Sequence, residues 1–240
     1  MTEPEPHNLL RISIVIPNYN SGPVLERAIR SLVDQNYPNL QIIMADSCST
    51  DESPAIIEKY KHAFDVLMVE KDKGQADGLN KGFARADGDI HGWLCGDDEL
   101  TPGTLHHIAE LFEKDPHAGV VTGACERIFS DGTSDVVKPD PEMPWKMRVQ
   151  NVIEQPSTFW RAALHRGIGP LDTKLHLCFD WEFWNRMRAR GAKFVPTDRV
   201  LSRYFFSETN KTSSSGEKMI RELFEVLRRH GPMGGGLAYV

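Results

Sequence analysis

The chain has 240 residues with 28 lysines and arginines against 34 aspartates and glutamates, so its formal net charge at pH 7 is -6. This length allows one α/β domain with a sizeable core, and the composition is ordinary for a globular protein. The negative charge gives no general attraction to nucleic acid or anionic lipid, and no apolar run approaches the length of a membrane span. We therefore expect no nucleic-acid partner and at most peripheral membrane contact. Four scattered cysteines without zinc-type spacing predict reduced thiols in a cytoplasmic protein, which could sit peripherally at the inner face of the membrane.

Short apolar runs alternate with amphipathic stretches along the first half of the chain, which predicts parallel strands joined by crossover helices. The predicted strands cover residues 12–16, 40–45, 66–69 and 90–95. Helices are predicted after Pro23, from Ser53, and across Ala76 to Phe83. Three β-α units in a row predict a parallel sheet with right-handed crossovers. The glycine-rich motifs of dinucleotide-binding oxidoreductases and of P-loop proteins are absent, so both classes are excluded.

The second half of the chain has a looser pattern. Its predicted elements are a helix after Pro102, a strand near Val120, a hairpin turn at 130–133, a proline-rich loop at 138–145, a helix at 179–190, short strands at 193–195 and 200–206, and a helix at 217–230. The apolar side of this last helix is expected to carry Met219, Ile220, Leu223, Phe224 and Leu227.

The fourth predicted strand leads straight into an acidic tip, residues 96–99, which reads Gly-Asp-Asp-Glu. Like charges this close raise one another's pKa unless a cation sits among them, so one interpretation is a divalent metal held by oxygen ligands. Open α/β sheets bind ligands at the carboxyl ends of their strands, where this tip would lie. The alternative is an acidic helix N-terminus, with Thr101 as N-cap and Pro102 as the first helical residue. The tip alone leaves both interpretations open.

Four motifs taken together are more specific than the acidic tip. They are Pro17-Asn18-Tyr19-Asn20, the turn from Ala45 to Asp51, the helix start from Gly74 to Asn80, and Asp97-Asp98. In this order and spacing the chain resembles the family 2 glycosyltransferases, from about Ile12 to about Thr212. The resemblance implies a glycosyltransferase A type fold, in which a Rossmann-like, mostly parallel sheet is flanked by helices. It also implies transfer from a nucleotide sugar with inversion at the anomeric carbon.

The resemblance also implies a division of the chain. Residues 12–212 would form a single glycosyltransferase domain, with a nucleotide-sugar-binding half at 12–100 and an acceptor and catalytic-base half at 101–212. Residues 1–11 would be a flexible N-terminus. Residues 213–240 would be a helical extension on the acceptor side with a glycine-rich tail.

The donor-site residues that the resemblance implies are Pro17, Tyr19, Asn20, Asp46, Gly74, Asn80 and Asp97. Asp46 would contact or support the nucleoside base, most often uracil, whose imide N–H needs an acceptor. The family often has a second acidic residue where this chain has Ser47, and the alternative is that Asp46 caps the turn at 49–51. Gly74 and Asn80 would shape the floor of the pocket.

The same resemblance implies a metal site that binds Mn²⁺ or Mg²⁺. Asp97 and Asp98 match the second half of the family's Asp-x-Asp motif, but Cys95 takes its first acidic position. Because a thiol is a poor ligand for these cations, we assign the metal chiefly to Asp98, with Asp97 sharing it or binding the ribose. Many relatives add a histidine near positions 205–206, where this chain has phenylalanine. Metal binding would then depend more on the diphosphate.

Asp180 aligns with the aspartate that the family uses to deprotonate the acceptor hydroxyl. Its aromatic neighbours would partly desolvate it and raise its pKa, which makes a stronger base. Phe179 departs from the glutamate that the family usually has there. The alternative role is an N-cap, because Asp180 stands where a helix opens. Glu182, on another helix face, is the lesser candidate.

The acceptor side is assigned to the loop from Lys138 to Gln155, which contains Trp145, and to Trp181. The segment after Gln155 resembles one that borders the acceptor cleft in relatives, and loops over a rigid sheet often carry specificity. The alternative is a packing loop or a dimer contact, which would make the protein a homodimer.

These inferences together predict a metal-dependent inverting glycosyltransferase of the hexosyl or N-acetylhexosaminyl type, with a UDP-sugar as the favoured donor. Its acceptor would be a hydroxyl of a saccharide or lipid-linked glycan, as in polysaccharide biosynthesis. One alternative is a nucleotidyltransferase, although residues 17–22 lack the basic glycine-rich loop that it would need. The other is a sugar-nucleotide-binding relative with weak catalysis.

Overall fold

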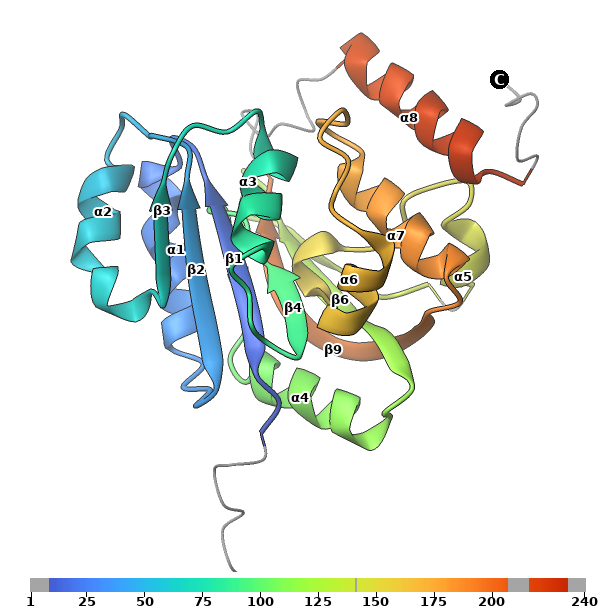
Figure 1. The fold of residues 1–240 in the computed structure, drawn as a ribbon, viewed down its shortest axis with the longest axis horizontal. Helices are drawn as coiled ribbons and strands as arrows, with labels where there is room; N and C mark the ends of the chain where they lie inside the picture. Colours follow the sequence, from blue (N-terminus) through green and yellow to red (C-terminus); the bar gives the residue numbers. More distant parts are fainter. Residues whose placement is uncertain (1–8, 141, 207–215, 233–240) are drawn as a thin grey trace, which may run out of the picture.

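A nine-stranded sheet with helices on both faces forms the centre of the protein (Figure 1). The computed structural model describes residues 9–140, 142–206 and 216–232. The strands are β1 Ile12–Asn18, β2 Leu40–Asp46, β3 Val66–Val69, β4 Ile90–Trp93, β5 Asp98–Leu100, β6 Ala118–Ile128, β7 Ser134–Val137, β8 Thr158–Arg161 and β9 Lys193–Phe205. The helices are α1 Gly22–Val33, α2 Ser53–Lys59, α3 Gln75–Phe83, α4 Thr104–Lys114, α5 Met143–Lys146, α6 Ala162–Ile168, α7 Phe179–Ala189 and α8 Gly216–His230, with short 3₁₀ turns η2 Lys61–Ala63 and η3 Gln155–Ser157.

The strand order is β3-β2-β1-β4-β8-β6-β9-β5, with β7 paired to β6. β1 to β4 are parallel, as the β-α alternation predicts. β8 is antiparallel to both β4 and β6, so β6 and its parallel neighbour β9 run in the same direction as the first four strands. The predicted hairpin turn at 130–133 joins β6 to β7. Each helix among the described residues is too short or too polar to cross a bilayer.

The apolar strand residues alternate between two packed layers. Ile14 and Ile16 of β1 pack with α1, α2 and α4 on one face of the sheet. Val15 packs with α3, α7 and α8 on the other. Because helices cover both faces, the central strands read as continuous apolar runs. Leu9 and Leu10, placed by the sequence in the flexible N-terminus, pack against the first of these layers, and residues 1–8 lie outside the described part.

The acidic tip differs from its predicted form. β4 ends at Trp93, and Asp98 belongs to a separate short strand, β5, which pairs antiparallel with β9. α4 starts at Thr104 after Gly103, whose φ of 74° is left-handed. The Thr101 hydroxyl donates to the Val200 carbonyl of β9. The helix-start interpretation of Thr101-Pro102 is therefore wrong, because Gly103 holds the N-cap position and Thr104 is the first helical residue.

The second half of the chain packs more tightly than its sequence indicates. The two short strands predicted after residue 192 are one irregular strand, β9. The segment from Lys138 to Gln155 contains α5, and the side chains of Met143, Met147 and Ile153 in this segment are buried. The Met147 carbonyl accepts a hydrogen bond from Trp181 Nε1 at 2.7 Å. This segment is therefore part of the core between α7 and the rest of the domain.

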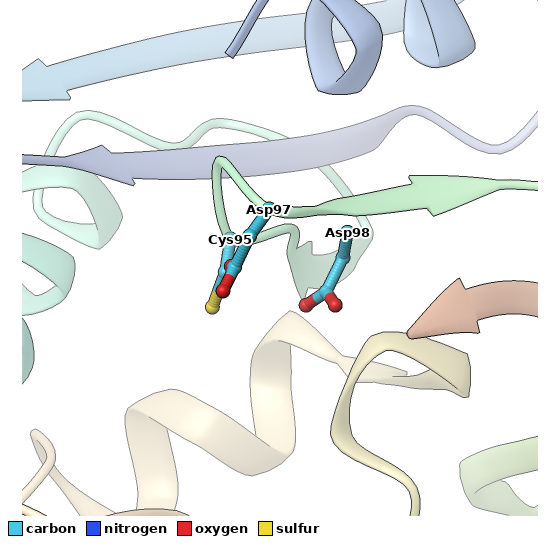
Figure 2. A group of neighbouring side chains, drawn as sticks. All are labelled: Cys95, Asp97 and Asp98. Carbon is cyan, nitrogen blue, oxygen red and sulfur yellow. The ribbon is translucent and has the colours of Figure 1, made fainter. Parts of the chain in front are cut away.

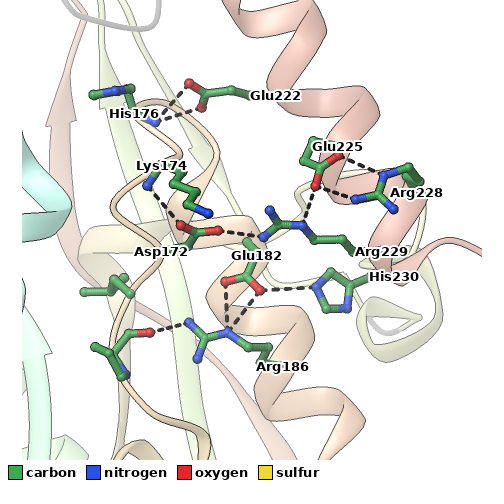
Figure 3. A network of polar contacts seen from close by, with 12 residues as sticks. Asp172, Lys174, His176, Glu182, Arg186, Glu222, Glu225, Arg228, Arg229 and His230 are labelled. Carbon is green, nitrogen blue, oxygen red and sulfur yellow. Dashed lines mark hydrogen bonds and ion pairs between the residues drawn. The ribbon is translucent and has the colours of Figure 1, made fainter.

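Met219, Leu223 and Leu227 of helix α8 pack against the core as predicted, but the buried face is rotated away from the other two predicted residues. Ile220 and Phe224 are 54% and 41% exposed, whereas Val226 and Glu222 are buried. Figure 3 shows the polar network that sets this orientation, with the Glu222 carboxylate at the turn before α7. It accepts hydrogen bonds from the backbone N–H groups of residues 176, 177 and 178 at 2.7–3.0 Å. The acidic side chain faces inward because these N–H groups precede α7 and need an acceptor.

We expect Glu222→Ala to be strongly destabilising. The change would leave three backbone N–H groups without their acceptor, and each such buried group costs about 1 to 3 kcal/mol. Urea unfolding should show a free energy of unfolding lower by about 3 kcal/mol or more. Glu217→Ala on the same helix is the control, because Glu217 is exposed and its ion pair within the described residues is with Arg221. Equal stability of the two variants would contradict the anchoring role of Glu222.

Candidate functional site

Two adjoining cavities lie at the carboxyl ends of the parallel strands, the usual ligand position in open α/β sheets. The larger has a volume of about 1000 Å³ and the smaller about 400 Å³. The loops after β1, β2, β3 and β4 form the larger cavity, whose lining includes Pro17, Tyr19, Asn20, Arg27, Lys71, Gly74 and Phe205. The smaller is lined by residues that include Asp98, Arg127, Asn151, Glu154, Gln155, His176 and Asp180. Gln75, Cys95 and Asp97 line both.

The loops after β1 and β2 hold each other in place. Asn20 adopts a left-handed φ of 53°. Its N–H donates to Ser49 Oγ at 2.9 Å, and its side-chain oxygen accepts from the Thr50 N–H at 2.9 Å. Tyr19 is 66% exposed at the rim of the larger cavity. These bonds fix the wall from which Tyr19 extends.

Asp46 lies behind this wall. Its side chain is 2% exposed and accepts hydrogen bonds from Asn18 Nδ2 and from both the N–H and the hydroxyl of Ser49. Asp46 does not line either cavity. Of its two predicted roles, direct contact with a base does not fit this geometry. Support of the turn at 49–51 does fit.

Gly74 and Asn80 were both expected at the pocket floor, and only Gly74 is there. Gly74 has a φ of 122°, and a Cβ on it would lie 3.2 Å from His176 Nδ1. Asn80 exchanges two hydrogen bonds with the backbone of Leu171, at 2.9 and 2.8 Å. It lines neither cavity and instead ties α3 to the segment before α7. The pocket-floor prediction for Asn80 is therefore wrong, because its amide is used between two elements.

The acidic tip forms a compact cluster between β4 and β5. Figure 2 shows the side chains of Cys95, Asp97 and Asp98 pointing to the same side, and their sulfur and carboxylate oxygen atoms lie within 4.8 Å of one another. Asp98 is 2% exposed, and its Oδ1 has no hydrogen-bond partner. Burial and the nearby Asp97 hold the pKa of Asp98 well above its usual value. A buried carboxylate oxygen without a donor is costly, and a cation among these groups would remove that cost. The residues therefore fit a divalent cation.

Arg27 of α1 is a cavity residue that the sequence did not single out. Its Nη2 donates to the Asp97 carbonyl at 3.1 Å, and its guanidinium carbon lies 3.4 Å from the centre of the Phe205 ring. Phe205 stands near the position where the family resemblance implied a histidine. Arg27 thus brings a fixed positive charge to the rim of the acidic cluster. Helical spacing alone could not reveal it, because Phe205 comes from the far end of the domain.

Asp180 lies in the first turn of α7, which begins at Phe179 after Cys178. Its Oδ1 accepts from the Trp181 N–H at 2.7 Å, and its Oδ2 accepts from Asn151 Nδ2 at 3.0 Å. Burial raises the pKa of Asp180 to about 6, and these two hydrogen bonds limit the rise. The N-cap interpretation is wrong, because Cys178 holds that position and the N–H groups of the preceding turn are bonded to Glu222.

Asp180 and Asp98 line the same smaller cavity, although 82 positions separate them in the sequence. Asp97 lines this cavity too, and Glu154, paired with Arg127, adds a fourth carboxylate to that wall. Glu182, the lesser candidate for the base, is 4% exposed and pairs with Arg186 and His230. Figure 3 shows it inside the network that joins α7 to α8. Its role is therefore structural.

The three residues assigned to the acceptor side have different positions. Gln155 lines the smaller cavity, and its Nε2 donates to the Trp93 carbonyl at 2.9 Å. Trp145 is 62% exposed and lines neither cavity. Trp181 is 1% exposed in the core, so its acceptor-side assignment is wrong. The last part of the loop predicted at 138–155 contributes Asn151 to the smaller cavity, where its Nδ2 donates a hydrogen bond to Asp180 Oδ2.

Comparison with known proteins identifies the family of the chain. The sequence model of glycosyl transferase family 2 matches residues 13–166, which is more than half of the chain. The chain belongs to glycosyl transferase family 2. The match covers the loops of the larger cavity and the acidic cluster, and it ends before Asp180.

Several curated relatives are also described as glycosyltransferases. An uncharacterized glycosyltransferase of Nostoc sp. is 34% identical over 47% of this chain and 36% of its own length. YwdF of Bacillus subtilis, likewise uncharacterized, is 26% identical over 92% of this chain and 85% of its own. TuaG of Bacillus subtilis, a putative teichuronic acid biosynthesis glycosyltransferase, is 32% identical over 51% of this chain and 49% of its own. The chain spans less than two thirds of the length of several of these relatives.

Solved structures show the same fold. S. aureus TarS (residues 1–349) in complex with UDP-GlcNAc has a TM-score of 0.70 at 20% identity, over 91% of this chain and 65% of that one. A mannosyltransferase from Pyrobaculum calidifontis, in complex with GDP-Man and Mn²⁺, has a TM-score of 0.72 at 18% identity, over 99% and 68%. The fold is therefore of the glycosyltransferase A type, as the sequence predicts.

Proposed function

We propose that this family 2 protein is a metal-dependent inverting glycosyltransferase, which moves a sugar from a nucleoside-diphosphate sugar to a hydroxyl group. The observation that carries the proposal is that one cavity holds both the acidic cluster and Asp180, and opens onto a second cavity large enough for a nucleotide. Family membership favours glycosyl transfer over the nucleotidyl-transfer alternative. The presence of Asp98 and Asp97 in one cavity with Asp180 favours an active enzyme over a weak binding relative.

In this proposal the larger cavity binds the nucleotide. Tyr19 at its rim offers an aromatic ring for the base, and Asp46 holds the turn beneath it. A UDP-sugar is the favoured donor, with a hexosyl or N-acetylhexosaminyl group to transfer. TarS binds UDP-GlcNAc and the Pyrobaculum enzyme binds GDP-Man, so nucleotide sugars of this size suit the fold.

Asp98, with Asp97, would hold the cation, Mn²⁺ or Mg²⁺. Once bound, such a cation stabilises the negative charge of the departing diphosphate. Asp98 suits this role because its unpartnered Oδ1 is buried and the residue lines the smaller cavity. Arg27 would add a fixed positive charge on the side of the larger cavity.

Asp180 would act as the base. Its carboxylate accepts the proton of the acceptor hydroxyl while the acceptor oxygen bonds to the anomeric carbon and the bond from that carbon to the diphosphate breaks. Attack from the side opposite the diphosphate inverts the anomeric centre. A pKa of about 6 keeps Asp180 ionised at neutral pH and basic enough to take the proton.

The acceptor would be a neutral hydroxyl of a saccharide or lipid-linked glycan, as in polysaccharide biosynthesis. The support is the acidic wall of the smaller cavity, where Glu154 and Asp180 would repel an anionic group. The relationship to TuaG also points to polymer synthesis. The free thiols of all four cysteines support a cytoplasmic location, with peripheral contact at the inner face of the membrane. A homodimer through the exposed Trp145 is part of the same proposal.

Calorimetric titration with a panel of sugar nucleotides, with and without Mn²⁺, tests the donor. We expect one UDP-sugar to bind best and to need the cation. NMR of the product formed with an oligosaccharide acceptor then tests inversion at the anomeric carbon. Retention of configuration, or tight binding of nucleoside triphosphates in place of sugar nucleotides, would contradict the proposal.

Arg27→Met gives a sharper test of the larger cavity. If Arg27 faces the diphosphate, the variant should bind UDP more weakly by about 1.5 to 3 kcal/mol, the range for a hydrogen bond to a charged group. Uridine, which lacks phosphate, should bind both proteins equally. Arg30→Met is the control, because Arg30 is exposed on the same helix and lines neither cavity. Calorimetry showing equal losses for UDP and uridine would place Arg27 at the base instead.

A further inference from the structure

The cation site contains a sulfur atom in addition to its carboxylates. Cys95 lies in the loop between β4 and β5, and its Sγ is within 4.8 Å of oxygen atoms of both Asp97 and Asp98. Bonds from a divalent cation to sulfur and to oxygen are about 2.3 and 2.0–2.2 Å long, so two ligand atoms of one ion lie up to roughly 4.5 Å apart. A small closing movement therefore lets one cation contact all three side chains.

Two glutamines hold the Cys95 thiol at this position. Gln75 Nε2 at the start of α3 donates to Sγ at 3.1 Å, and the thiol donates to Gln155 Oε1 at 3.6 Å. Gln155 is itself fixed by its hydrogen bond to the Trp93 carbonyl. On binding a metal the thiol would give up its proton, because the thiolate is the form that binds metals. The hydrogen bonds with Gln75 and Gln155 thus hold the Cys95 side chain close to the two aspartates.

The second observation is the buried carboxylate of Asp98. It is 2% exposed, it faces the smaller cavity, and its Oδ1 has no hydrogen-bond partner. This oxygen needs a positive charge or a donor. The sulfur beside it decides which cations suit the site, because thiolate ligands favour Co²⁺ and Zn²⁺ over Mg²⁺, with Mn²⁺ between them.

We propose that Cys95 is a metal ligand and that it shifts the preference of this site from Mg²⁺ toward thiophilic divalent cations. The inference rests on the proposed function, since it concerns the same cation. It replaces the sequence-based view that the thiol stays out of the site. Among these divalent cations, this site should bind Mn²⁺ and Co²⁺ more tightly than Mg²⁺, and Cd²⁺ most tightly.

The test uses Co²⁺ as a spectroscopic probe on the full chain with UDP present. A sulfur-to-cobalt charge-transfer band in the near ultraviolet reports direct ligation by a thiolate and needs no enzymatic turnover. We expect this band in the parent and its loss in Cys95→Ser. Cys48→Ser is the control, because Cys48 lines the larger cavity but is outside the cluster. The control should keep the band.

Cys95→Asp is a second variant, and it should reverse the cation preference of the site. Replacing sulfur by a carboxylate should raise the affinity for Mg²⁺ and lower that for Cd²⁺. Because loss of even an outer-shell partner costs about tenfold to a hundredfold in metal affinity, we expect the ratio of Cd²⁺ to Mg²⁺ affinities to fall by at least about tenfold. Circular dichroism of each variant confirms that it is folded before titration.

The outcomes separate the inference from the proposed function. If the parent binds Co²⁺ or Mn²⁺ in the presence of UDP without a sulfur band, or if Cys95→Ser keeps the band, Cys95 is not a ligand and the metal-dependent function stands. If the parent binds none of these cations with or without UDP, both proposals are wrong. An unchanged ratio of Cd²⁺ to Mg²⁺ affinities in Cys95→Asp also overturns the inference.

Discussion

Asp180→Asn should lower turnover by about a hundredfold to ten-thousandfold, the usual contribution of a general base, while donor affinity stays unchanged. Asparagine has nearly the size of aspartate but cannot accept the proton of the acceptor hydroxyl. The geometry supports this expectation, because Asp180 shares the smaller cavity with the acidic cluster. Single-turnover transfer and calorimetric donor binding measure the two quantities separately. A collapse of donor affinity with unchanged transfer per bound donor would make Asp180 a binding residue.

The pH profile provides an independent readout of the same residue. The base must be ionised, so kcat/KM of the parent should rise with pH through about 6, the pKa of Asp180, and then level off. Asn151 donates to Asp180 Oδ2 at 3.0 Å and so favours its charged form. Asn151→Ala should therefore move the rise to higher pH. Asp180→Asn should lose this rise altogether.

Asp98→Asn should remove metal-dependent turnover, with a loss of several kcal/mol of transition-state stabilisation, or on the order of a thousandfold in rate. The metal-free variant should still fold and should melt at a higher temperature than the parent, because it removes a buried charge beside Asp97. Added Mn²⁺ with UDP should raise the melting temperature of the parent and leave that of the variant almost unchanged.

Asp97→Asn is the matched comparison for Asp98. Asp97 is half-buried, whereas Asp98 is 2% exposed and has the unpartnered oxygen. We therefore expect Asp97→Asn to weaken the response to Mn²⁺ less than Asp98→Asn does. Full activity of Asp98→Asn, or of the parent in excess chelator, would rule out the metal role.

The β-α half of the fold follows from local sequence patterns. The strand over residues 66–69 and the helical face of Ala76, Leu79 and Phe83 lie where periodicity predicts them. Strand and helix periods are properties of neighbouring residues, so one sequence suffices to reveal them. The loops that follow parallel strands converge at one edge of the sheet, and Pro17, Tyr19 and Gly74, which the family resemblance assigned to the donor site, line one cavity there.

Side-chain partners from distant elements could not be predicted in this way. Asn80 is a polar residue in a motif position, yet its amide is taken by the backbone of Leu171, far along the chain. Trp181 stands beside Asp180 but points into the core. A motif indicates which loop a residue belongs to, while the packing around it decides whether its side chain faces a ligand or another element.

The sequence by itself predicted the four parallel strands β1 to β4, the family and the acidic composition of the segment after β4, because these follow from local periodicity and from the order of motifs along the chain. Only the tertiary structure decided the environment of the carboxylates. It buried Asp98 without a partner, brought Asp180 to the same cavity and turned Glu222 of α8 inward to the turn before α7. These features arise from contacts across many tens of residues, which depend on how β5, α7 and α8 dock and which no local periodicity encodes.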